Sequence, residues 1–185
     1  LEARSRKGNE VLQPDVLVSL HIDAAPWPQV SGRQVRAPVD VNRTHVLIFG
    51  CLAAAELAQA DQAGQMLHKL FNGSGHEEYA LGRAMAAALA EATGLPPMQY
   101  GGPNAVPMAG SRGYLWARNL MLLRGVRCPV VMLEPFMANS REAYPRLQAG
   151  LAKRAAGEAP GGEDLLVRYA EAVVAGLMAH YGPPE

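Results

Sequence analysis

Two ionisable side chains in this sequence each stand at the end of an apolar run. His21 directly follows residues 16–20, and Glu134 ends the run that begins at Pro129. A histidine is a natural zinc ligand, and a carboxylate beside a metal-bound water is a natural general base. The pair is therefore a candidate for metal-assisted hydrolysis. Taken alone, the two residues also fit a structural histidine at a strand end and a glutamate that caps a neighbouring helix.

The segments that must position these side chains are three short strands. Residues 16–21, 44–49 and 129–134 are apolar almost without alternation, which is typical of strands covered on both faces. Helix-forming segments lie between and after them, at 51–71, 74–93 and 163–181. This alternation predicts an α/β fold, a three-layer domain with a mostly parallel central sheet flanked by helices. Ligands gather beyond the carboxyl ends of such strands, so we expect both side chains at one sheet edge.

Size and composition argue against several classes of protein. A chain of 185 residues with 49% hydrophobic residues is long enough for one domain with a sizeable core. The formal net charge is +0 and charges do not cluster, which argues against a nucleic-acid-binding protein. The apolar runs are much shorter than the roughly 20 residues of a transmembrane segment. Cys51 and Cys128 are far apart in sequence, so we expect small buried side chains rather than metal ligands.

Three segments carry a resemblance to a known family. "PDVLVSLHIDAAP" (14–26) resembles the histidine motif of zinc-dependent N-acetylmuramoyl-L-alanine amidases of the amidase-3 family. "RNLMLLRGVRCPVVMLEPFMANSREA" (118–143) is similar to the second hallmark of that family, and "LEARSRKGNEVLQPD" (1–15) to the approach to its histidine strand. The three motifs occur in the family's order and cover most of the chain. We therefore expect a single amidase-3-like catalytic domain over residues 1–185.

The resemblance implies both a reaction and roles for particular residues. These amidases cut the amide between N-acetylmuramic acid and L-alanine of peptidoglycan, using a Zn²⁺ held by two histidines and a glutamate, with a second glutamate as catalyst. His21 matches one metal ligand, and Glu134 matches the catalytic glutamate. Bound zinc lowers the pKa of its water to about 7 and polarises the carbonyl. Asp23 and Arg124 are candidates for site support, with turn formation and a salt bridge as their structural alternatives.

The rest of the family's ligand set has no counterpart in this sequence. The first histidine and the glutamate ligand belong to a loop and helix that precede the matched region. We therefore expect that this chain lacks the family's first strand and helix. The further zinc ligands, and residues that stabilise the sheet, are then expected upstream of Leu1. The remaining histidines match no ligand position and are predicted to be surface or structural residues: His45, His68, His76 and His180.

Departures from the family pattern leave two other functions open. Pro135 follows Glu134, and the glycine that the family places two residues after this glutamate is absent. The altered stretch is compatible with a related zinc amidohydrolase that acts on small N-acyl amino acids. The incomplete ligand set is compatible with a non-catalytic peptidoglycan-binding domain.

Two segments are candidates for the walls of the substrate cleft. Residues 95–113 are rich in proline and glycine, and a loop of that length is usually functional or mobile. Residues 51–73 follow the second strand; in some family members an inserted helix in a comparable region blocks the zinc until a regulatory protein partner removes it. An ordinary packing helix is the favoured interpretation of 51–73. The resemblance also implies a bacterial protein of the periplasm or cell wall.

Overall fold

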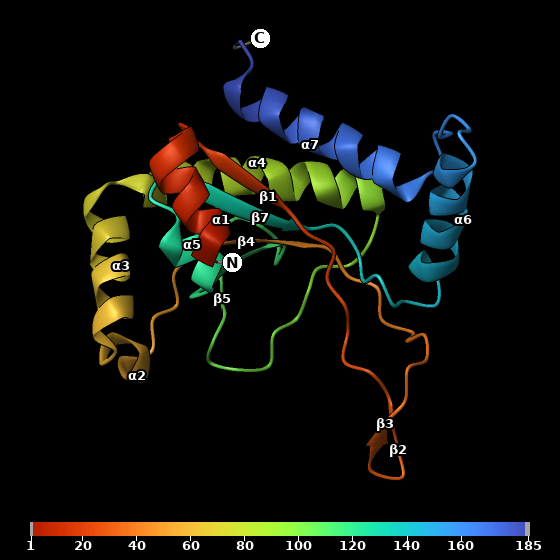
Figure 1. Ribbon diagram of the computed structural model, residues 1–185, viewed down its shortest axis with the longest axis horizontal. Coiled ribbons are helices and arrows are strands. Elements are labelled where there is room, and N and C mark those ends of the chain that lie inside the picture. The colour runs from red at the N-terminus through yellow and green to blue at the C-terminus, as the bar shows by residue number, and fades with distance from the viewer. Residues whose placement is uncertain (1, 184–185) are drawn as a thin grey trace.

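The computed structural model describes residues 2–183, and its centre is one five-stranded sheet (Figure 1). The strand order is β1-β7-β4-β6-β5. The strands are β1 (Leu17–Leu20), β7 (Val130–Glu134), β4 (His45–Phe49), β6 (Leu115–Arg118) and β5 (Val106–Pro107). All three strands predicted from apolar runs therefore lie side by side in one sheet. The α/β class is confirmed.

Strand direction changes twice across this sheet, once in its middle and once at the edge where β5 pairs antiparallel with β6. β1 pairs with β7 in parallel, and β4 pairs with β6 in parallel. Between these two pairs β4 runs antiparallel to β7, so that His45 lies opposite Glu134. The sheet is thus more mixed than the sequence predicted. As a result, the amino end of β4 lies at the same sheet edge as the carboxyl ends of β1 and β7.

Two long helices cover one face of the sheet. They are α4 (Ser74–Thr93) and α7 (Leu165–Tyr181), and they lie against each other above the strands in Figure 1. Alternate side chains of the strands, such as Val46 and Leu133, pack with Met85 of α4 and Tyr169 of α7 in one buried cluster. The Tyr169 hydroxyl donates to the Leu133 carbonyl at 3.2 Å. This face of the sheet is therefore fully closed.

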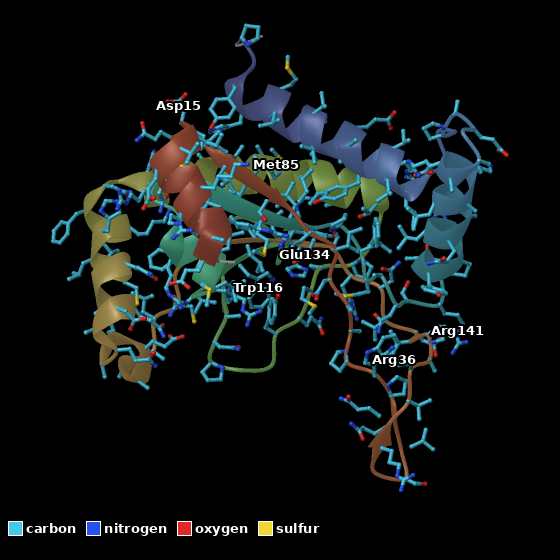
Figure 2. The ribbon with its side chains drawn as sticks, in the orientation of Figure 1. Asp15, Arg36, Met85, Trp116, Glu134 and Arg141 are labelled. Atoms are coloured by element: carbon cyan, nitrogen blue, oxygen red, sulfur yellow. The ribbon has the colours of Figure 1, made fainter. Side chains whose placement is uncertain are left out.

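The opposite face is covered by shorter elements and is partly open. α5 (Met121–Gly125) packs there beside α1 (Glu2–Lys7), which continues into the π-helical turn η1 (Gly8–Leu12). Leu47, Trp116 and Met132 form the strand side of this second core cluster. Trp116 and Met85 lie on opposite sides of the sheet in Figure 2. The residues with polar side chains at the sheet edge reach this second face.

A buried ion pair fixes the next helix. α2 (Ala54–Leu57) and α3 (Ala60–Phe71) follow β4, and Lys69 of α3 reaches Glu78 of α4. Neither side chain is more than 1% exposed, and the Lys69 ammonium also donates to the Cys128 carbonyl at 2.8 Å. Burying such a pair is tolerated because each charge faces its partner and further hydrogen bonds. Residues 51–73 thus contain a helix that packs on the domain.

The remaining elements lie away from the core. α6 (Ala143–Ala155) accommodates Pro145 in its first turn, where no intrahelical N–H is needed. A hairpin of β2 (Gln29–Val30) and β3 (Arg33–Gln34) projects as an arm in Figure 1, and Arg36 lies on it in Figure 2. Cys51 and Cys128 are both half-buried and free, rather than fully buried as expected. Among the described residues, no helix is long and apolar enough to cross a membrane.

Candidate functional site

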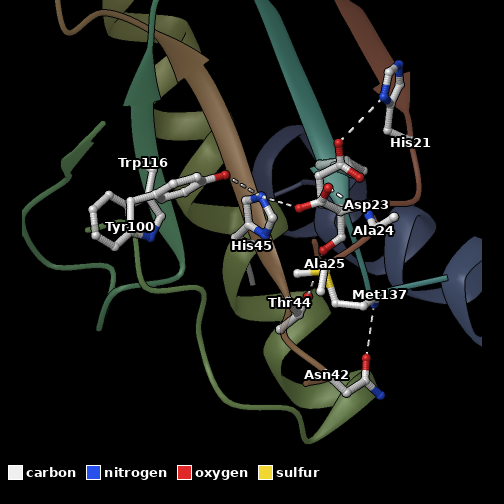
Figure 3. A network of polar contacts seen from close by, with 12 residues as sticks. His21, Asp23, Ala24, Ala25, Asn42, Thr44, His45, Tyr100, Trp116 and Met137 are labelled. Atoms are coloured by element: carbon white, nitrogen blue, oxygen red, sulfur yellow. Dashed lines mark hydrogen bonds and ion pairs between the residues drawn. The ribbon is translucent and has the colours of Figure 1, made fainter. Parts of the chain in front are cut away.

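The two residues singled out by the sequence meet at one edge of the sheet. His21 follows β1 and its backbone N–H donates to the Leu133 carbonyl at 3.1 Å, which continues the parallel pairing by one residue. Glu134 is the last residue of β7. The His21 Nδ1 lies 3.5 Å from the Glu134 Oε1 (Figure 3). The predicted arrangement of these two side chains at one edge is therefore present.

Glu134 lies in surroundings that favour its neutral form. Its side chain is 8% exposed, and its Oε2 has no hydrogen-bond partner among the described residues. Burial raises the pKa of this carboxyl from 4.5 to about 8, and the charge of Asp23 adds to the shift. Such shifts are typical of carboxyl groups that exchange protons during catalysis.

Asp23 has two functions in the turn that follows β1. Its Oδ1 accepts the Ala24 N–H at 2.7 Å, and its carbonyl accepts the Ala138 N–H at 2.7 Å. The first bond stabilises the turn itself, and the second ties the segment after β1 to the segment after β7. The other carboxylate oxygen, Oδ2, faces His45 at 3.9 Å from Nε2. The turn-forming role considered for Asp23 is thus observed, and its charge also reaches the site.

His45, like Tyr100 and Arg118, is a polar residue of the cleft that the sequence did not single out. Of the two predicted roles, surface or structural, an exposed fraction of 1% excludes the first, and the side chain also lines the cleft. The Tyr100 hydroxyl lies 2.9 Å from its Nε2, and the two rings meet edge to face. Burial first, and then the charge of Arg118, lower the pKa of His45 from 6.5 to about 4. At neutral pH His45 is therefore an uncharged imidazole.

A cleft of about 240 Å³ connects these side chains. One group of lining residues is polar and comprises His21, Asp23, His45, Tyr100, Arg118 and Glu134. The other group is apolar and comprises Leu47, Leu120, Met121, Leu122 and Met132. Tyr100 comes from the 95–113 loop, so that loop forms one wall. No residue of 51–73 lines the cleft, in agreement with the interpretation of 51–73 as a packing helix.

Arg124 lies in a different part of the molecule. Its Nε donates to the Gln65 Oε1 at 3.0 Å, and it lines a separate hollow together with Asp61 and His68. Arg124 is not among the lining residues of the cleft that contains His21 and Glu134. Its role in site support stays a prediction. Of the other histidines, His180 pairs with Glu77 at 2.8 Å, outside the cleft.

The polar side chains of the cleft include potential metal ligands. Within residues 2–183 no group of three histidine, cysteine, aspartate or glutamate side chains converges as a metal site would require. His21 has the right chemistry for one ligand, and the orphaned Oε2 of Glu134 leaves an acceptor free beside it. This part of the chain therefore does not by itself complete a zinc site.

Comparison with known proteins identifies the fold. The sequence matches no model of a protein family and no curated protein. The structure is similar to that of the N-acetylmuramyl-L-alanine amidase Ami1 from Mycobacterium smegmatis, with a TM-score of 0.53 and 21% identity over 98% of this chain. It is also similar to apo Ami1 from Mycobacterium abscessus (TM-score 0.56, 21% identity, 97% of this chain). A third similar structure is the N-acetylmuramoyl-L-alanine amidase AmiC2 of Nostoc punctiforme (0.52, 17%, 99%).

These matches cover nearly all of this chain but only part of each similar structure. The chain spans 60% of both Ami1 structures and 66% of AmiC2. At this level of identity the similarity establishes a shared α/β fold over nearly the whole of this chain. Function has to be argued from the cleft and its residues.

Proposed function

We propose that this protein is an N-acetylmuramoyl-L-alanine amidase of the amidase-3 type, which hydrolyses the amide between N-acetylmuramic acid and L-alanine in peptidoglycan. The observation that carries the proposal is the meeting of His21 and Glu134, 3.5 Å apart, in a cleft on the sheet edge. The two residues belong to separate motifs and lie 113 positions apart in the sequence. The fold shared with three structures named as such amidases supports the same reaction.

Glu134 is the proposed general base and acid. It takes a proton from the attacking water and passes it to the leaving amine, a role that typically contributes about 10²- to 10⁴-fold to the rate. Because its pKa is raised to about 8, the carboxyl needs a positive charge nearby to be ionised at neutral pH. That positive charge is required close to Glu134 Oε1, and His21 Nδ1 lies 3.5 Å from this oxygen.

We propose Zn²⁺ as the cofactor, with His21 as one of its ligands. Residues 2–183 provide no complete ligand set, so the proposal requires further ligands from outside the described residues. Because the donor set is incomplete, we assign no catalytic step to the metal. Because the proposed substrate is peptidoglycan, we propose the periplasm or cell wall as the compartment.

The proposal is tested in the full-length protein with two variants. We expect that His21→Ala loses bound zinc, measured by mass spectrometry of the metal, together with release of peptides from purified sacculi. Glu134→Gln preserves shape but not proton transfer, so we expect it to keep the zinc and lose most turnover. His68→Ala is the matched control, because His68 is exposed and lies outside the cleft.

Different results point to different functions. If Glu134→Gln digests sacculi at the wild-type rate, Glu134 is not the base and the proposal is wrong. Cleavage of small N-acyl amino acids without cleavage of sacculi indicates the related zinc amidohydrolase. Sedimentation with sacculi, without zinc and without peptide release, indicates a non-catalytic binding domain.

A further inference from the structure

Arg118 is the one arginine or lysine among the residues that line the cleft. It ends β6, next to Phe49 of β4 in the sheet register. Its guanidinium lies over the ring of Tyr100, with Cζ 4.9 Å from the ring centroid, and it also hydrogen-bonds the Tyr100 hydroxyl. The ring thus fixes the plane of the guanidinium and orients it within the cleft.

The charge of Arg118 has no anionic partner in the part of the chain that the structure describes. No carboxylate among residues 2–183 forms an ion pair with it, and its Nε is buried without a hydrogen-bond partner. A buried N–H of a cation is costly to leave unpaired. The apolar side chains of Leu120 and Leu122 line the same cleft and strengthen any charge interaction made there. An unpaired guanidinium of this kind suits a carboxylate, which it can bind through two parallel hydrogen bonds.

We propose that Arg118 is the specificity residue for a carboxylate on the amine side of the scissile amide. This inference rests on the proposed amidase function and names the group that the enzyme recognises next to the reacting bond. In a muramoyl peptide the acyl side is an uncharged sugar with its lactyl ether. The carboxylates are on the peptide that leaves as the amine. The substrate class is therefore an N-acyl peptide whose first residues carry a free carboxylate.

The sheet register sets the spacing between the two parts of this site. Glu134 lies opposite His45, and Arg118 lies beside Phe49, four residues further along β4. At about 3.3 Å per residue, the two positions are on the order of 13 Å apart along the strand. Tyr100 bridges this interval, since it contacts Arg118 with its ring and His45 with its hydroxyl. A dipeptide leaving group spans such a distance once the reach of the arginine side chain is subtracted.

The test compares two substrates that differ only in charge. N-acetylmuramoyl-L-alanyl-D-glutamate is compared with the same compound carrying amidated carboxyl groups, using wild-type protein, Arg118→Gln and Arg118→Lys. We expect Arg118→Gln to lower kcat/KM for the acid by about 10- to 100-fold, mainly through KM, and to change that for the diamide less than about threefold. Arg118→Lys retains the positive charge but lacks the planar guanidinium with its two parallel donors. We therefore expect its kcat/KM for the acid to lie between the values of the wild type and Arg118→Gln. Arg36→Gln, an exposed arginine on the arm, is the matched control.

A binding measurement makes the result independent of turnover. L-alanyl-D-glutamate is expected to raise the Tm of the wild-type protein, whereas its diamide is expected to leave that Tm unchanged. Neither compound is expected to raise the Tm of Arg118→Gln. Equal losses on acid and diamide show that Arg118 only positions Tyr100, and they overturn the inference while the amidase function stands. Absence of hydrolysis of both compounds overturns the amidase function, and the Tm shifts then decide whether Arg118 binds a carboxylate. Absence of a Tm shift in the wild type, with equal kinetics, also rejects the inference.

Discussion

Glu134 carries its carboxyl group in a place where ionisation is unfavourable. Burial and the nearby charge of Asp23 both act in the same direction, and together they raise the pKa to about 8. The folded protein therefore holds a proton that the unfolded chain, with a pKa of 4.5, releases at lower pH. Stability attributable to this group is complete below pH 4.5 and is lost as the pH rises through 8.

Substitution of Glu134 by glutamine is expected to remove the loss of folding stability at high pH. Without bound metal, Glu134→Gln should be more stable than the wild type at pH 9, on the order of a few kcal/mol at about 1.4 kcal/mol per pKa unit. At pH 4.5 or below the two proteins should differ little. Urea denaturation in the presence of a chelator measures the difference at each pH. Glu171→Gln, at an exposed position of α7, is the control, and a pH-independent effect of Glu134→Gln contradicts the assignment.

His45 imposes the opposite dependence on pH. Its pKa is about 4 in the fold and 6.5 in the unfolded chain, because burial and Arg118 oppose the imidazolium. The unfolded state thus binds more protons between these values, and stability falls as the pH drops from 6.5 towards 4. We expect His45→Gln to reduce this acid-induced loss by about 2–3 kcal/mol. Comparing urea denaturation at pH 7 and pH 4 tests this, with His68→Gln as the exposed control; equal acid sensitivity of both variants and the wild type would refute it.

At the scale of elements, the close approach of α4 and α7 closes one face of the sheet. Gly176 of α7 is buried against Met85 of α4, where an added Cβ meets the sulfur at 2.6 Å and the backbone Cα at 3.1 Å. The helices can be this close because residue 176 has no side chain. The two helices thus pack against one face of β4 and β7, and the strand side chains on the opposite face line the cleft.

Two glycine substitutions separate packing from helix propensity. Gly64→Ala in α3 adds a Cβ with nothing within 4 Å, so it should stabilise the protein by about 0.5–1 kcal/mol. Gly176→Ala gains the same propensity but must displace Met85, and overpacking typically costs about 1–3 kcal/mol. We therefore expect opposite signs for the two variants. Thermal unfolding measures both, and stabilisation by Gly176→Ala contradicts the packing argument.

At the scale of the whole molecule, the arm contributes little to the fold. The hairpin residues 29, 30, 33 and 34 are all exposed, and the arm is anchored only at its base, where Val39 pairs with Ser140 and Arg141 binds Asp40 at 2.7 Å. The arm projects away from the sheet edge and from both helical layers (Figure 1). Stability is therefore expected to reside in the sheet and its two covers.

Replacing residues 29–34 with a short glycine–serine linker tests this division. Surface changes are usually within about 0.5 kcal/mol, and 1 kcal/mol shifts the Tm of a chain of this size by about 2–4 °C. We expect the Tm to change by less than about 2 °C in scanning calorimetry. A larger decrease that depends on protein concentration shows that the arm packs against a second copy instead.

The sequence by itself determined the three main strands, the α/β class and the pairing of His21 with Glu134. It could do so because apolar runs without alternation identify covered strands, and because the ends of two parallel neighbours lie at one sheet edge. It missed β6, which is short, begins among glycines and ends in an arginine, so its apolar pattern is weak. Residues 2–183 contain no complete ligand set for the expected zinc site, so the zinc centre stays a prediction.

Only the tertiary structure decided that His45, Tyr100 and Arg118 belong to the same cleft. The apolar pattern of a strand does not indicate which neighbouring strand it pairs with, or in which direction. The antiparallel alignment of β4 with β7 is what brings His45 opposite Glu134. Tyr100 lies in an irregular loop, and Arg118 ends a strand four residues further along the sheet. Their contacts depend on the path of the chain between the strands, which the local sequence does not encode. They also depend on side chains that are long enough to reach one another in the cleft.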